Sequence, residues 1–130
     1  MTQSIARALD TVRRSIPQGV ELVAVSKFHP AEAVAEAYAA GQRVFGESRI
    51  QAPRPKAPAR PADIRWHFIG HLQTNKVRQL VAARCVSLIE SVDSERLLRL
   101  IDDESLRADT VTRVLLQAHV AAEETKFGFD

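Results

Sequence analysis

Lys27 is the residue of this chain whose type and position best fit covalent chemistry. It closes the run Leu22–Lys27, whose other members are mostly valine, leucine and alanine. Such a run is typical of a short strand buried on both faces, and lysine is almost never buried without a partner. Loss of water around a lysine at such a strand end favours its neutral, nucleophilic amine. The chemistry that uses this amine is imine formation with a carbonyl group.

Polar residues also follow the other predicted strands. Doubly wound sheets and (β/α)8 barrels both place ligands at the carboxyl ends of their parallel strands. In this chain those ends carry Lys27, Glu47 and Ser48, Gly70 and His71, Glu90 and Ser91, and His119. Polar residues therefore gather at one edge of an otherwise apolar sheet, which favours a ligand site there.

Each of these residues also has a simpler structural interpretation. Lys27 could extend its stem along the surface and leave its charge in water, or it could pair with Glu47, which would keep the amine protonated. The loop Gly70–Lys76 could hold a phosphate or carboxylate on free amides, or it could be an ordinary helix start. His67 is expected to satisfy core hydrogen bonds, and its spacing from His71 does not suit a zinc site.

The elements that position these residues alternate along the chain. Apolar residues at helical spacing predict a helix over residues 3–15, ended by Pro17 and Gly19. Later helices are predicted between Pro30 and Gly41, after a cap at Thr74 or Asn75, and after Asp93 and Ser94. Strands are predicted over residues 22–27, 44–47, 65–70, 85–90 and 113–120. Strands alternating with helices indicate a parallel α/β sheet.

Residues 52–62 interrupt this alternation. They contain four prolines, which remove amide donors and block a helix interior. We expect an irregular or polyproline-like connection there. A complete (β/α)8 barrel takes roughly 200 residues or more, so five strands in 130 residues would form only part of one.

Composition narrows the class of function. A formal net charge of +2 without clustered cations and aromatics disfavours nucleic-acid binding. A single cysteine, Cys85, excludes an internal disulfide and fits a reducing compartment. No stretch is long and apolar enough to span a membrane, and the amino-terminal segment does not resemble a signal peptide. The expected location is therefore cytoplasmic, with no membrane partner.

With these residues in view, the chain resembles the pyridoxal phosphate homeostasis proteins. These are pyridoxal 5'-phosphate (PLP)-binding barrels related to the N-terminal domain of alanine racemase. The matching stretches are Leu22–Lys27, Ala40–Glu47, Trp66–Lys76 and Leu115 through Phe129. They run through most of the chain in the family's order, and the stretch Trp66–Lys76 is the most specific of them.

The resemblance implies a fold, a cofactor and a role. The fold would be a partial (β/α)8 TIM-type barrel, with an N-terminal helix and about five parallel strands, as one incomplete domain over residues 1–130. Lys27 would form the internal aldimine with PLP, and Glu47, Ser48 and His71 would also contact the cofactor. The role would be PLP homeostasis, through buffering or delivery, without catalytic turnover. The small-molecule cofactor would be the partner, and the complete form is expected to be a monomer.

The chain departs from the family pattern at three places. Ser48 stands where the family usually has asparagine, and the proline-rich stretch 52–62 replaces a helical segment. The last three strand–helix units are absent, and in the family these carry the groups that hold the phosphate. The resemblance therefore implies weak cofactor affinity in this chain.

Two other functions remain open at this point. One is a PLP-dependent amino-acid racemase, which needs a second acid or base on the opposite face of the cofactor. The only tyrosine, Tyr38, lies on the apolar stripe of a predicted helix and fits that role poorly. The other is a binding or scaffold role without a cofactor.

Overall fold

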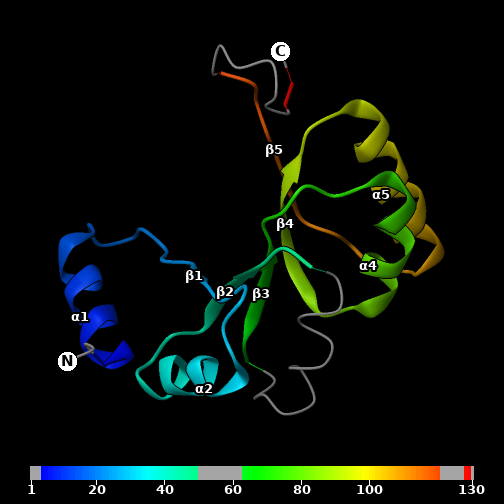
Figure 1. Cartoon of the computed structure of the whole chain (residues 1–130). Coiled ribbons are helices and arrows are strands. Elements are labelled where there is room, and N and C mark those ends of the chain that lie inside the picture. Colours follow the sequence, from blue (N-terminus) through cyan, green and yellow to red (C-terminus); the bar gives the residue numbers. More distant parts are fainter. Residues whose placement is uncertain (1–3, 50–62, 121–127, 130) are drawn as a thin grey trace.

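The structure is a computed structural model that describes residues 4–49, 63–120 and 128–129 (Figure 1). In chain order its helices and strands are α1 (Ile5–Ser15), β1 (Ala24–Val25), α2 (Ala31–Ala39), β2 (Val44–Glu47), β3 (Arg65–Phe68), the 3-10 turn η2 (Thr74–Lys76), α4 (Val77–Ala83), β4 (Val86–Val92), α5 (Glu95–Arg107) and β5 (Val114–Leu116). The predicted irregular connection over residues 52–62 lies outside the described residues.

The strands form one parallel sheet in the order β1-β2-β3-β4-β5. Strands that are neighbours in sequence are therefore neighbours in space, as crossover connections of one hand produce. All four residues of β2 are buried, because a central strand of such a sheet is covered on both faces. The α/β class and the five parallel strands predicted from the sequence are confirmed.

Two helices begin at serine caps. The side chain of Ser4 accepts a hydrogen bond from the amide of Arg7 at the start of α1, and Ser94 accepts one from the amide of Leu97 at the start of α5. Such caps satisfy amides that the helix itself leaves unpaired. The predicted cap at Asp93 or Ser94 is thus confirmed at Ser94.

Several predicted boundaries are wrong. The first strand has two residues rather than six. At its start, the Leu22 carbonyl accepts from the Gln42 side chain and lies outside the ladder, and at its end the backbone turns at Lys27 and Phe28. The fifth spans three residues, and the fourth begins after Cys85 and extends to Val92. Neither Thr74 nor Asn75 caps α4, because both belong to a 3-10 turn that leads into the helix.

The apolar residues form two core clusters. One joins β3 and β4 to α4 and α5, and the other joins α1 and α2 to β2 and β3. Figure 1 shows the two helix pairs on separate parts of the sheet. Phe45 and Trp66 belong to the second cluster, with ring centroids 5.6 Å apart. Both clusters hold the strands in register, so the strand ends are fixed relative to one another.

A further pairing follows β5. Ala118 and Phe129 form a parallel bridge, in which the amide of His119 donates to the carbonyl of Phe129 at 2.6 Å and the amide of Phe129 donates to the carbonyl of Gln117 at 2.7 Å.

Within the described ranges, no helix has the length and apolar character needed to cross a bilayer.

Candidate functional site

Lys27 lies at the carboxyl edge of the sheet, in the turn that follows β1. The amide of the preceding residue, Ser26, still donates to the carbonyl of Gly46 at 3.0 Å, which continues the ladder between β1 and β2. The Lys27 side chain is exposed. Among the residues that the structure describes, no ion pair or hydrogen bond involves its amine, so the pairing with Glu47 considered from the sequence is not present. The amine is therefore accessible to a ligand.

Phe28, next in the chain, has two unusual properties. Its φ of 67° places a bulky residue in the left-handed region, which is rare for side chains other than glycine and asparagine. Its side chain is 82% exposed, although large apolar residues are normally covered. The guanidinium of Arg49 lies over its ring at 5.4 Å from the centroid. This contact joins the turn after β1 to the end of β2.

Glu47 is deeply buried, with 1% exposure. Its Oε1 accepts a hydrogen bond of 2.8 Å from the Ser26 hydroxyl. In the register of the sheet Glu47 lies opposite Phe68, and Phe68 belongs to a core cluster. Glu47 therefore faces the side of the sheet that the helices cover, and its hydrogen bond with Ser26 links it to the residue that precedes Lys27.

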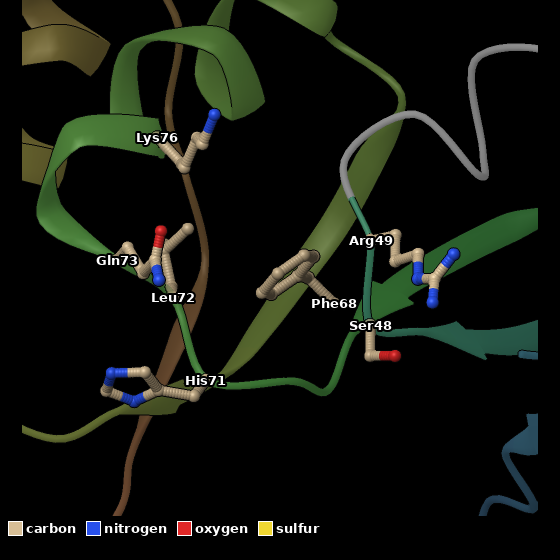
Figure 2. A pocket seen from close by; sticks show the side chains of 7 residues that line it. All are labelled: Ser48, Arg49, Phe68, His71, Leu72, Gln73 and Lys76. Atoms are coloured by element: carbon tan, nitrogen blue, oxygen red, sulfur yellow. The ribbon is translucent and has the colours of Figure 1, made fainter.

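Ser48 and His71 line one pocket of about 210 Å³. Figure 2 shows Ser48 and Arg49 on one side of this pocket, His71, Gln73 and Lys76 on the other, and Phe68 between the two groups. The pocket is also lined by Leu72. Each of its polar side chains can donate a hydrogen bond, and Arg49 and Lys76 add positive charge. The described lining contains no carboxylate, so the pocket favours an anion.

Gly70 sets the distance between the two sides of this pocket. A Cβ added to Gly70 would lie 2.6 Å from the Ser48 Cβ and 3.0 Å from the Ser48 backbone. Real Cβ contacts are essentially never that short, so only glycine permits this approach. The loops after β2 and β3 are therefore held against each other by direct backbone packing.

Two histidines connect β3 to β4. The Nδ1 of His71 lies 3.2 Å from the Oδ2 of Asp93, and the Nδ1 of His67 lies 3.0 Å from the Oε2 of Glu90. The second pair agrees with the hydrogen-bonded core position expected for His67. The first pair fixes the orientation of His71 beside the pocket. In the described ranges, no three His, Cys, Asp or Glu side chains are grouped to hold a metal ion.

The opposite edge of the sheet holds a different polar cluster. The Tyr38 hydroxyl donates to Asp63 at 2.7 Å, and the guanidinium of Arg43 lies 3.7 Å from the Tyr38 ring centroid and 3.1 Å from the Oδ2 of Asp63. The hydrogen bond to Asp63 raises the pKa of Tyr38, and the same bond lowers the pKa of Asp63. These residues precede β2 and β3, far along the strands from Lys27.

Sequence reasoning found Lys27, Ser48 and His71 at the carboxyl edge and did not find Arg49, Gln73 or Lys76. Arg49 follows Ser48 directly, and Gln73 and Lys76 belong to the loop that was considered as an anion site. A search for donor side chains just beyond each strand end would have found all three. The anion preference comes from these side chains rather than from the helix amides, because α4 has only seven residues and follows a 3-10 turn.

Comparison with known proteins gives one consistent result. The family model for the alanine racemase N-terminal domain matches residues 2–130. The pyridoxal phosphate homeostasis protein of Schizosaccharomyces pombe is 39% identical over 130 residues, which cover 96% of this chain and 55% of the relative. The pyridoxal phosphate homeostasis protein of Aquifex aeolicus is 34% identical over 135 residues, which cover 98% of this chain and 58% of the relative.

The solved structures of PipY from Synechococcus elongatus PCC7942 agree. The structure without PLP has a TM-score of 0.90 at 40% identity and covers 97% of this chain and 59% of PipY. The structure with PLP bound has a TM-score of 0.86 at 40% identity, and the match covers 97% of this chain and 58% of PipY. The chain thus spans between half and two thirds of the length of these relatives, and its fold is part of a TIM-type barrel. Because the family model matches nearly every residue, the chain belongs to the alanine racemase N-terminal domain family.

Proposed function

We propose that this chain binds PLP at the carboxyl edge of its sheet and that its role is PLP homeostasis. The observation that carries the proposal is the exposed amine of Lys27 at that edge, without an ion pair to any described residue. Relatives named for PLP homeostasis and a PLP-bound PipY structure support the cofactor. The aldehyde of PLP is an electrophile that condenses reversibly with a primary amine, with loss of water.

The residues at this edge fit the cofactor in type. Lys27 supplies the amine for a Schiff base, and Ser48 and His71 present polar atoms beside a pocket that favours anions. Glu47 is a positioning residue in this proposal, because it holds Ser26, the residue before Lys27, through a hydrogen bond of 2.8 Å. Together these side chains bind and orient the ligand.

The single cysteine fits a reducing compartment, and we propose the cytoplasm as the place of this role.

A racemase-like reaction is the weaker alternative. It needs a second acid or base near the ligand, and the only tyrosine lies at the other edge of the sheet. The Tyr38 hydroxyl is committed to Asp63, and this hydrogen bond raises the pKa of Tyr38. The proposed role is therefore buffering or delivery of the cofactor without turnover.

The test is the absorption spectrum of the protein mixed with PLP. We expect a visible Schiff-base band in the unaltered protein and its loss in Lys27→Ala. Lys76→Ala is the comparison variant, because Lys76 is another lysine at this edge and lines the pocket; it is expected to require more PLP but to reach the same band at saturation. A band of equal strength in Lys27→Ala contradicts the assignment of Lys27, and no band in the unaltered protein contradicts PLP binding.

The absence of turnover has its own measurement. Alanine incubated with the PLP-loaded protein in deuterated water is expected to keep its Cα proton. Exchange of that proton above the rate with PLP alone would favour the racemase-like alternative.

A further inference from the structure

We propose that β5 pairs with the β5 strand of a second copy of this chain, in an antiparallel two-fold dimer centred on Leu115. The strand lies at one edge of the sheet, and β1, which precedes Lys27, lies at the other. The inference therefore concerns an interaction surface outside the ligand site and does not depend on PLP.

The first observation is that β5 presents open backbone groups along its outer side. On its inner side, the Arg113 carbonyl and the Gln117 amide are bonded to β4 at 3.0 Å and 2.7 Å. Backbone groups of successive strand residues point to alternate sides, so those of Val114 and Leu116 point away from β4. Among the residues that the structure describes, none forms a hydrogen bond with these outward groups. Such an edge is a template for a further strand.

The second observation is the apolar character of this edge. Leu115 is 50% exposed and Leu116 is 59% exposed, and since neighbouring residues point to opposite faces, both faces of the strand are uncovered. Val111 and Val120, which flank the strand, are also exposed. Exposed edges of native sheets often carry charged residues or proline, which prevent further pairing. The strand itself contains neither.

An antiparallel register centred on Leu115 satisfies the open groups with those of the same strand in the second copy. Val114 of one copy then lies opposite Leu116 of the other, and each such pair exchanges two hydrogen bonds. Leu115 lies opposite itself on the two-fold axis, at the position where side chains approach most closely. Arg113 lies opposite Gln117, so no like charges face each other. The strand is therefore complementary to itself in backbone and in side chains.

This self-complementarity favours a second copy over an unrelated strand. A two-fold interface uses the same surface on both copies, and β5 meets that condition with its hydrogen-bonding groups, its apolar side chains and its charges. The contact is short compared with the roughly 1,200–2,000 Å² that stable interfaces bury. We therefore expect a weak dimer whose formation depends on protein concentration.

The experiment measures the mass of the 130-residue chain by sedimentation equilibrium over a range of protein concentrations. The unaltered protein is expected to approach twice the mass of one chain as the concentration rises. Leu116→Pro removes an outward amide and leaves the ladder with β4 intact. Because two hydrogen bonds are then lost per dimer, the dissociation constant is expected to rise by about 5- to 150-fold.

Leu115→Lys and Leu115→Glu test the two-fold register. Each variant alone places like charges opposite each other and is expected to be monomeric. An equimolar mixture places opposite charges there and is expected to form a mixed dimer at concentrations where each variant alone is monomeric. Val20→Lys is the matched control, because Val20 is 55% exposed and precedes β1, and it should dimerise like the unaltered protein.

Three results would overturn the proposal. The first is the mass of one chain at every concentration up to about 1 mM, which would leave the edge to another segment of the chain or to an unrelated partner. The second is a dimer that forms equally well in Leu116→Pro and Leu115→Lys, because its contact then lies elsewhere. The third is a mixture of the two charged variants that stays monomeric, because it excludes the two-fold register.

Two further measurements make the result specific. Circular dichroism checks that each variant keeps the fold. The Schiff-base band with PLP is expected to be equal in all these variants, because Lys27 lies beyond the opposite edge strand. Dimer formation and PLP binding can therefore fail independently.

Discussion

At the amino edge of the sheet three arginines form hydrogen bonds or ion pairs with other parts of the chain, whereas three described cations of the carboxyl edge form none with a described residue. Arg13 donates to the carbonyl of Ala40 at 2.9 Å and to Gln42 at 2.8 Å. Arg43 pairs with Asp63, and Arg65 pairs with Glu21 at 3.2 Å. At the carboxyl edge Lys27, Arg49 and Lys76 form no ion pair with a described residue.

This difference separates charges that stabilise the fold from charges that remain available to a ligand. A cation whose hydrogen bonds are already satisfied within the protein has little to offer a ligand, but its removal leaves partners unpaired. A cation without such partners contributes little to stability and remains available for an anion. The carboxyl edge is also where parallel α/β folds bind their ligands. Measurements of stability and of titration test this contrast.

Gly70→Ala should give the largest effect, because it acts on the backbone packing that holds the carboxyl edge together. The new Cβ would lie 2.6 Å from the Ser48 Cβ. We expect the free energy of unfolding to fall by about 1–3 kcal/mol, the usual cost of an overpacked site, in urea denaturation. The double variant Ser48→Gly with Gly70→Ala removes the closest contact and should recover part of the loss. A double variant no more stable than Gly70→Ala would show that the contact with the Ser48 Cβ is not the cause.

Arg13→Met should destabilise the protein by about 1–2 kcal/mol, because it removes two hydrogen bonds from a half-buried charged donor and keeps the apolar stem. Arg14→Met is the matched control on the same helix. Its ion pair with Asp10 is exposed on both sides and should contribute little. Lys76→Met, at the carboxyl edge, should change stability by less than about 0.5 kcal/mol. Equal losses at Arg13 and Lys76 in urea denaturation would contradict the contrast between the edges.

Tyr38→Phe should have the smallest effect, and it is best measured by titration. Without the hydroxyl hydrogen bond, the pKa of Asp63 should rise toward its usual value. The measurement is a pH titration of the Asp63 carboxyl group followed by NMR. Because the pKa of Asp63 is lowered in the folded protein, its stabilisation is present above about pH 4 and is lost as the pH falls. Because the pKa of Tyr38 is raised, its stabilisation is lost as the pH rises above about 10. The variant should therefore show a flatter dependence of stability on pH at both extremes. An unchanged pKa for Asp63 would contradict this account.

The order of elements could be predicted because it depends on local patterns. Runs of apolar residues and turn signals placed the five strands, and residues after strands were expected at one edge. Alternation along β2 could also have placed Glu47 correctly. Phe45 and Glu47 are two apart and share a face, so an apolar core around Phe45 implies that Glu47 is buried beside it.

Other features depend on contacts between distant segments and leave no local pattern. The pairs of His71 with Asp93 and of Phe28 with Arg49 each join two strand ends, and they require the final register of the sheet. The late start of β1 also had no local signal, because Leu22 and Val23 favour a strand although they lie outside it. The turn that exposes Lys27 therefore depends on contacts in the folded chain and not on the local sequence of residues 22–27.

The conformation of Phe28 has a consequence for protein engineering. Glycine and asparagine adopt a positive φ at lower cost than phenylalanine, and an exposed ring is easily replaced. A selection for thermal stability should therefore recover these substitutions at position 28 early. Such variants would melt later but would lose the contact of the Phe28 ring with the Arg49 guanidinium, so the gain in heat resistance would loosen a connection between the turn after β1 and the end of β2.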